Sequence, residues 1–136
     1  MQDKIEQHER FWRGQGPCLI QIPAGEQPLY DLEDYPRRFR DPKAMWHSEM
    51  ARARGLADWP TDGIPTVRPN LGVIFVPSLA GLPYELPDGQ MPWPGKHLTR
   101  AEIRTVRDAT VEDAELMQRA AAFYRIHREK DGDPIA

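Results

Sequence analysis

The stretch CLIQI at residues 18–22 decides the predicted fold. It is a short apolar run bounded by Pro17 and Pro23, which is typical of a buried strand. Because it lacks the alternation of a half-exposed strand, we expect both of its faces to be covered, as in a parallel sheet. The stretch IPTV at residues 64–67 is a second predicted strand, although Pro65 removes one backbone donor.

Helix signals surround these two strands. A first helix is predicted at Lys4–Trp12, and residues 24–40 are expected to form a loop. Asp41 followed by Pro42 predicts the start of another helix, since Asp is a good N-cap and Pro suits the first helical position. We expect that helix to end at Gly55. Its predicted buried stripe consists of Met45, Trp46, Met50 and Ala53.

Further helices are predicted in the second half of the chain. Residues 72–80 are expected to form a short helix interrupted by Pro77. Thr99 and Glu102 have the spacing of a capping box, which predicts a short helix after Thr99. A longer helix is expected at residues 110–132, because acidic residues begin it and basic residues end it. Its predicted face consists of Val111, Ala114, Met117, Ala121 and Tyr124, widened by Leu116, Ala120 and Phe123.

The order of these elements predicts an α/β fold with a parallel sheet. Strand, helix, strand and helices follow one another, and PIA at residues 134–136 is similar to the first residues of a third strand. We therefore expect residues 1–136 to be the N-terminal segment of a larger enzyme. Such a segment is not expected to hold a complete active site.

Composition excludes several classes of protein. The chain has 136 residues with 40% hydrophobic and 29% charged, which is typical of a globular protein. Its net charge of −3 argues against a nucleic-acid binder, which needs a basic face. No apolar run approaches the about 18 residues needed to cross a bilayer, and the charged N-terminus is unlike a signal peptide. With a single cysteine, Cys18, no internal disulfide is expected, and a cytosolic setting is predicted.

The segment Leu56–Leu98 is rich in both proline and apolar residues. Eight of the 14 prolines fall in it, so it is expected to form neither a long helix nor a central strand. It also keeps apolar residues such as Val73, Ile74, Phe75 and Trp93, which suit a packed segment better than a free linker.

Common catalytic and metal-binding motifs are absent from the sequence. It has no glycine-rich nucleotide loop, no HExxH and no CxxC. Cys18 is expected to be a buried, inert thiol. The four histidines do not have the spacing of metal ligands and are expected on surfaces or helix faces. They are His8, His47, His97 and His127.

For some charged and aromatic residues, the sequence allows either a binding role or a structural role. The basic cluster of Arg37, Arg38, Arg40 and Lys43 could bind a carboxylate or phosphate, but a solvated face balanced by Glu33, Asp34 and Asp41 is favoured. Trp46 and Trp93 could each stack on a planar ligand. Trp46 is expected in the core, whereas the role of Trp93 stays open.

Gln21, Arg68 and Asn70 are the predicted substrate-binding residues. Gln21 lies at the end of the first predicted strand, and Arg68 and Asn70 follow the second. In parallel α/β sheets, ligands bind outside the carboxyl ends of the strands. The alternative is structural: Arg68 pairs with a nearby acid, and Asn70 caps the following helix.

The order of motifs resembles the N-terminal third of the uroporphyrinogen decarboxylase superfamily, which includes methyltransferases acting on corrinoid proteins and thiols. Four segments carry the resemblance. They are CLIQIPAGEQPLY at residues 18–30, the RDP helix start at 40–42, IPTVRPNLGVIFVPSLAG at 64–81, and residues 82–103, which include GQMPWPGKHLTRAEI.

The resemblance implies a (β/α)8 TIM barrel, of which this chain would supply the first two strands and the start of the third. The resemblance also implies that, in the decarboxylase, arginines beside the Ala-Gly loop bind the carboxylates of the substrate. At these positions this chain has Ile22 and Glu26. Glu would repel a substrate carboxylate, so the methyltransferase-like branch is favoured over the decarboxylase, a lyase. No catalytic residue and no metal ligand is assigned within the chain. Zinc and a corrinoid are expected only in the complete enzyme, which would act on a small molecule.

A different reading needs no enzyme. In it, the chain is a non-catalytic module that binds a protein partner through the proline-rich apolar region, residues 56–98.

Overall fold

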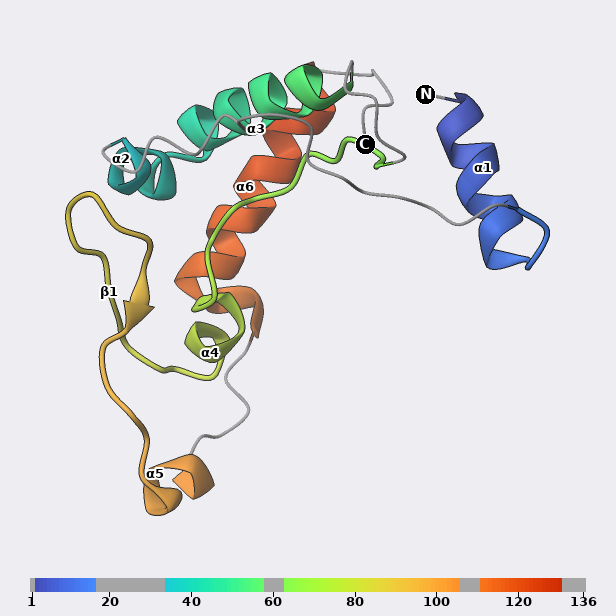
Figure 1. The fold of residues 1–136 in the computed structure, drawn as a ribbon. Coiled ribbons are helices and arrows are strands. Elements are labelled where there is room, and N and C mark those ends of the chain that lie inside the picture. The colour runs from blue at the N-terminus through green and yellow to red at the C-terminus, as the bar shows by residue number, and fades with distance from the viewer. Residues whose placement is uncertain (1, 17–33, 58–62, 106–110, 131–136) are drawn as a thin grey trace.

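The computed structural model describes residues 2–16, 34–57, 63–105 and 111–130, and these residues are mainly helical (Figure 1). Its elements in chain order are α1 (Gln2–Trp12), α2 (Tyr35–Arg40), α3 (Pro42–Ala57), α4 (Phe75–Leu79), β1 (Tyr84–Glu85), β2 (Trp93–Pro94), α5 (Arg100–Thr105), the 3-10 turn η1 (Val111–Asp113) and α6 (Glu115–Lys130).

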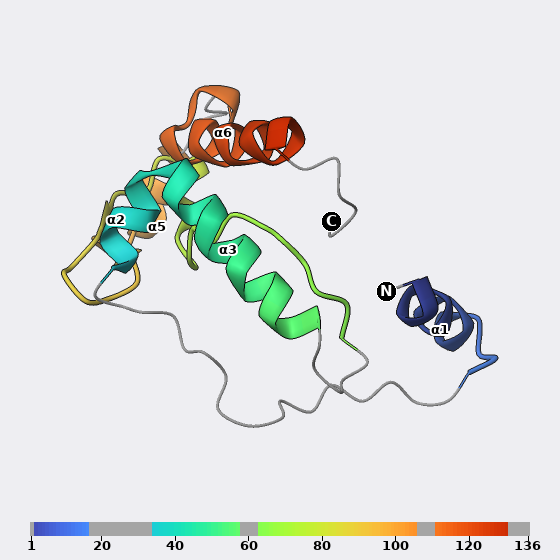
Figure 2. The same ribbon diagram turned by 90° about the horizontal axis from the view of Figure 1, so that it is seen from above.

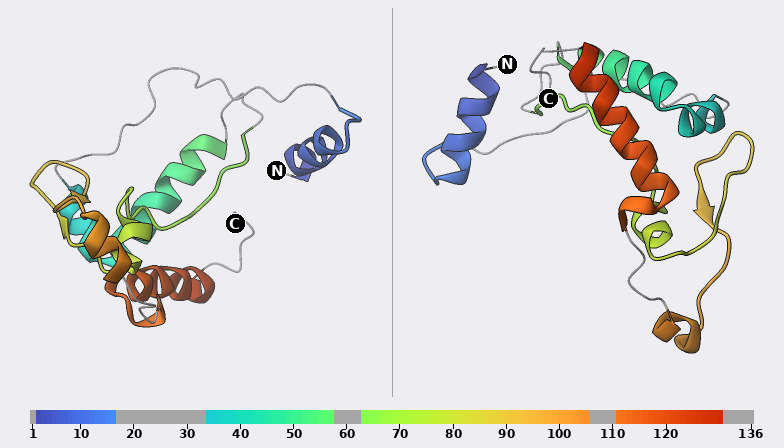
Figure 3. Two further views of the ribbon diagram at one scale, coloured as in Figure 1. Left: turned by 90° about the horizontal axis from the view of Figure 1, so that it is seen from below. Right: turned by 180° about the vertical axis from the view of Figure 1, so that it is seen from behind.

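The helical body is built on α3 and α6, which cross and pack against each other (Figures 1 and 2). α2 packs beside the start of α3, and α4 lies against α6. α1 lies apart from this body in every view, and α5 lies away from the helix pair in Figure 1 and in the right-hand view of Figure 3. The body is therefore a helix pair extended by short elements.

One core holds the body together. It takes side chains from α2, α3, α6 and the irregular segment before α4, so the segment is fixed to the helix pair. Burial of large apolar side chains contributes about 1.5–3 kcal/mol each. The buried members are Tyr35, Phe39, Met45, Trp46, Met50, Ala53, Val67, Leu71, Ile74, Leu116, Ala120 and Phe123.

The predicted start of a (β/α)8 barrel is wrong. The described residues contain one sheet, in which β1 and β2 pair antiparallel, Tyr84 with Pro94 and Glu85 with Trp93. An antiparallel pair can be joined by a short connection, whereas parallel barrel strands need helical crossovers. The first predicted strand, residues 18–22, and the third, residues 134–136, lie outside the described residues.

The second predicted strand, residues 64–67, belongs to no sheet. Its apolar residues pack on helices instead: Val67 is buried in the core. The carbonyl oxygen of Thr66 accepts a hydrogen bond from the Arg52 side chain of α3 at 3.1 Å, and Arg52 is itself paired with Glu49 at 3.0 Å. A side chain thus binds a backbone group that a neighbouring strand would bind in a sheet.

The start and stripe of α3 confirm the sequence prediction. The Asp41 carboxylate accepts hydrogen bonds from the backbone N–H of Lys43 at 2.9 Å and of Ala44 at 3.3 Å. The four stripe residues, Met45, Trp46, Met50 and Ala53, are all buried. The predicted end at Gly55 is wrong, because the helix continues to Ala57 and Gly55 does not have the positive φ of a C-terminal cap.

The helix expected at Lys4–Trp12 is confirmed as α1. Two other predictions need correction. Residues 35–40, expected to belong to a loop over residues 24–40, form α2, which has Pro36 in its first turn and buries Phe39. The helix expected at 72–80 shrinks to α4, where Pro77 is tolerated because the helix is only five residues long.

The capping box is confirmed. The Glu102 carboxylate accepts a hydrogen bond from the Thr99 backbone N–H at 2.8 Å, and the Thr99 hydroxyl accepts one from the Glu102 N–H at 3.3 Å.

The long helix predicted at residues 110–132 is interrupted after η1, and α6 begins at Glu115. Of the residues predicted to form its apolar face, Leu116, Ala120 and Phe123 are buried, whereas Val111 and Tyr124 are exposed.

Candidate functional site: the Arg68–Trp93 groove

A groove of about 610 Å³ lies between the segment before α4, the residues around β2, and α6. We call it the Arg68–Trp93 groove. It is lined by residues 68–73, Phe75, residues 91–93 and Tyr124. Its volume lies within the range of about 300–1,000 Å³ that is usual for ligand sites.

Two contacts hold the walls of the groove in place. The Tyr35 hydroxyl, from α2, donates a hydrogen bond to the Asn70 carbonyl oxygen at 2.9 Å. Gly72 has a φ of 68°, and a Cβ on it would lie 3.0 Å from Cγ of Pro92. Glycine therefore allows both the turn and the close approach of the two walls. Leu71 and Ile74 are buried beneath, so the groove is part of the packed body.

Several large apolar side chains in and next to the groove are exposed to solvent. Val73 is 71% exposed, Trp93 57% and Tyr124 45%. Val76, which follows the lining residue Phe75, is also 71% exposed. Apolar side chains gathered on one exposed surface are typical of binding sites.

Arg68 is the charged residue among those that line the groove. Its side chain is exposed, and within the described part of the chain its guanidinium has no hydrogen-bond or ion-pair partner. The alternative in which Arg68 pairs with a nearby acid thus finds no support among the described residues. The Asn70 side chain likewise caps no helix there: the residue at the N-cap of α4 is Ile74.

The structure brings Arg68, Asn70 and Trp93 together in one groove, although the predicted strand before Arg68, residues 64–67, belongs to no sheet in the described part of the chain. Gln21, the other predicted substrate-binding residue, lies outside the described residues, as do Cys18, Ile22 and Glu26. Tyr124 was missed as a groove residue. Its place on an alanine-rich helix made it resemble a core residue, and only the packing of α6 shows which side faces outward.

A second cavity, of about 670 Å³, lies between α2, β1 and α6. There the Tyr84 hydroxyl donates to the Glu115 carboxylate at 3.3 Å. Arg119 donates to the same carboxylate and to the Phe39 carbonyl oxygen, the latter at 2.8 Å. Burial, and then the charge of Glu115, raise the pKa of Tyr84. These side chains bind one another across three elements, which is a structural role.

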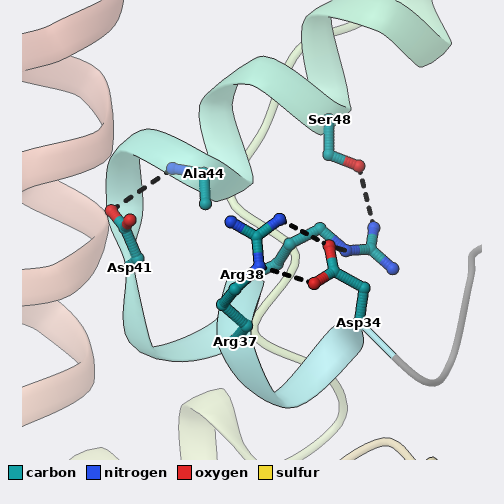
Figure 4. A network of polar contacts seen from close by, with 6 residues as sticks. All are labelled: Asp34, Arg37, Arg38, Asp41, Ala44 and Ser48. Carbon is teal, nitrogen blue, oxygen red and sulfur yellow. Dashed lines mark hydrogen bonds and ion pairs between the residues drawn. The ribbon is translucent and has the colours of Figure 1, made fainter.

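In the basic cluster, Arg37 fits the favoured prediction of a solvated face balanced by acids, whereas Arg38 does not, because it is buried (Figure 4). Arg37 donates to both carboxylate oxygens of Asp34, at 2.6 and 2.8 Å, and lowers the pKa of that carboxyl. Arg38 is buried and donates to the Ser48 hydroxyl of α3 at 2.8 Å. Arg40 and Lys43 are exposed.

Trp46 lies in the core, as expected, and its indole N–H donates a hydrogen bond to Nδ1 of His127 on α6 at 3.2 Å.

No group of three or more His, Cys, Asp or Glu residues in the described ranges is placed to hold a metal ion. Within those ranges, no helix has the length and apolar character needed to cross a membrane. The cytosolic setting stays a prediction.

Comparison of the chain with family models, with curated proteins and with solved structures finds no match. The resemblance to the uroporphyrinogen decarboxylase superfamily therefore stays a prediction.

Proposed function

We propose that this chain is a partner-binding module and that its binding surface is the Arg68–Trp93 groove. One observation carries the proposal: Val73, Trp93 and Tyr124 stay largely exposed around a groove whose floor belongs to the packed core. The surface lies mostly within residues 56–98, the region expected to bind a protein partner.

Energetics favour this assignment. Exposed apolar surface gains about 25 cal/mol per Å² when a partner removes it from water. Tryptophan and tyrosine contribute most to such contacts, because they bury a large area at a small cost in side-chain entropy. The fixed walls add to this, since a surface that is already ordered loses little entropy on binding.

A protein partner suits the groove better than an enclosed small molecule. Ligand pockets usually bury most of the ligand surface. Here the lining residues Val73 and Trp93 are more than half exposed to solvent, which suits a longer chain lying across the groove.

The test is a selection of short random peptides on the intact protein, followed by affinity measurements on Trp93→Ala. We expect selected peptides to lose at least about tenfold in affinity, as is usual for a tryptophan at the centre of an interface. Trp12→Ala is the matched control, because Trp12 is 79% exposed on α1 and outside the groove. Equal sensitivity to both substitutions, or no selected peptide at all, would contradict the proposal.

A second candidate function keeps Arg68 and Asn70 as substrate-binding residues of a methyltransferase-like enzyme. It is supported by their lying with Trp93 in one groove, which fits a planar ligand that carries a carboxylate. Gln21 remains part of this prediction. Because the described residues offer no cluster of zinc ligands, no role for zinc is assigned to them.

Absorbance titration with a porphyrin and with a corrinoid tests this second function. We expect saturable binding that weakens in both Arg68→Met and Trp93→Ala, since the first removes the charge and the second the stacking surface. Binding unaffected by either substitution would place the ligand elsewhere and reject this role for the groove.

A further inference from the structure

We propose that the partner presents an acidic side chain beside an apolar one on an extended peptide segment, and that Arg68 binds the carboxylate. This inference rests on the partner-binding function proposed above. It adds the chemistry of the partner, which the apolar surface alone does not specify.

The first argument concerns the place of Arg68. Arg37 pairs with Asp34, Arg52 with Glu49, and Arg119 with Glu115. Arg68, like the exposed Arg40 and Arg128, has no acid in contact with it in the described part of the chain, and among the arginines it alone lines the Arg68–Trp93 groove. A guanidinium matches a carboxylate with two parallel hydrogen bonds, so an acidic group is its natural ligand.

The second argument concerns the backbone of the partner. The Asn70 carbonyl oxygen is held by Tyr35, which fixes the residue beside Arg68. The Asn70 side chain has an acceptor oxygen and a donor NH2 group, and it lines the groove. Such an amide can bind the N–H and C=O of one peptide unit. These groups are free in an extended segment, whereas a helix uses them internally.

The third argument concerns the apolar residue of the partner. Trp93 and Tyr124 line the same groove as Arg68 and are both largely exposed. An aliphatic or aromatic side chain placed between them would remove their faces from water. Excluding water there also strengthens the adjacent ion pair, because screening by solvent falls.

Synthetic peptides taken from the selection described above test the inference. Each is made with its acidic residue as Asp or Glu, as the matching amide, and as Lys. Affinities are measured on wild type, Arg68→Met and Arg68→Glu, with Arg128→Glu as the control, since Arg128 is exposed on α6 outside the groove. We expect the amide to bind wild type about 1.5- to 5-fold more weakly, the range usual for a solvent-exposed ion pair.

The variants then locate the effect. In Arg68→Met the difference between acid and amide should disappear, and in Arg68→Glu the Lys peptide should bind best. Arg128→Glu should keep the wild-type order. If peptides depend on Trp93 but prefer no acid, or if the preference survives in Arg68→Met, the inference is overturned while the partner-binding function stands. If no peptide depends on Trp93, both fall.

Discussion

The α3–α6 helix pair and the proline-rich segment before and after α4 use apolar residues in opposite ways. In the helix pair, the apolar stripe of each helix faces the other, and Met50 and Phe123 are almost completely buried. In the proline-rich segment before α4, Leu71 and Ile74 are buried in the core while Val73, between them, is exposed to solvent. A helix has one apolar side to bury, whereas an irregular segment can place apolar residues on both sides.

This difference separates stability from binding. Removing apolar area from the helix pair should unfold the protein, and removing it from the outer side of the segment should affect only binding. The following substitutions test that separation.

The largest effect is expected at Phe123, in the centre of α6. Phe123→Ala should destabilise the protein by about 3–5 kcal/mol, because it leaves a cavity in the core. Tyr124→Ala, at the adjacent residue, should change the free energy of unfolding by only about 0.5 kcal/mol while weakening peptide binding. Chemical denaturation measures both. Equal losses of stability would show that the groove is part of the core.

A smaller effect is expected at Gly72, where the two regions meet. Gly72→Ala should cost about 1–3 kcal/mol, because Ala resists the positive φ and its Cβ would press on Pro92. Gly55→Ala is the matched control: Gly55 lies inside α3 with open space around it, so Ala should stabilise by about 0.5–1 kcal/mol. If both substitutions act with the same sign, the close approach at Gly72 is not what fixes the groove.

Local signals in the sequence predicted local structure well. The Asp41 N-cap, the stripe of α3 and the Thr99–Glu102 capping box depend on residues within one or two turns, and all are present. The barrel depended on strand pairing between distant segments, which residues 64–67 cannot reveal by themselves. Their carbonyl and apolar groups bind α3 and the core instead.

The buried face of α6 and the residues that form the groove show a further limit of prediction from the sequence. Ala120, Ala121 and Ala122 follow one another in α6, so the apolar face of this helix is broad and the sequence does not decide which part of it is buried. The prediction therefore placed Tyr124 on the apolar face. Arg68 and Asn70 were chosen because they follow a predicted strand. They do line a groove, but the neighbours that form it, Tyr124 above all, come from distant parts of the chain.

A third test examines the start of the helix pair. Asp41→Ala should destabilise the protein by about 1 kcal/mol, since two backbone N–H groups lose the carboxylate that binds them. Asp41→Asn should keep most of the stability, because Asn caps as well as Asp. Thermal unfolding of the two variants distinguishes them. An equal loss in both would assign the effect to the charge of Asp41 rather than to its hydrogen bonds.

The smallest effect is expected in α5, which lies apart from the helix pair and is held by its own cap (Figure 1). The Lys96 ammonium, followed by the Thr99 N–H and hydroxyl, lowers the pKa of Glu102 from 4.5 to about 2. The folded-state pKa is depressed, so the cap stabilises α5 fully above pH 4.5 and loses this contribution as the pH falls through about 2.

Titration of the Glu102 carboxyl by NMR, with the α5 amides as a second probe, measures this dependence. Glu102→Gln should abolish the pH-dependent change in α5 while leaving the signals of α3 and α6 in place. A Glu102 carboxyl that titrates near 4.5 would mean that Lys96 and Thr99 do not bind it in solution. A change that spread to α3 would mean that α5 is coupled to the helix pair, against the separation described above.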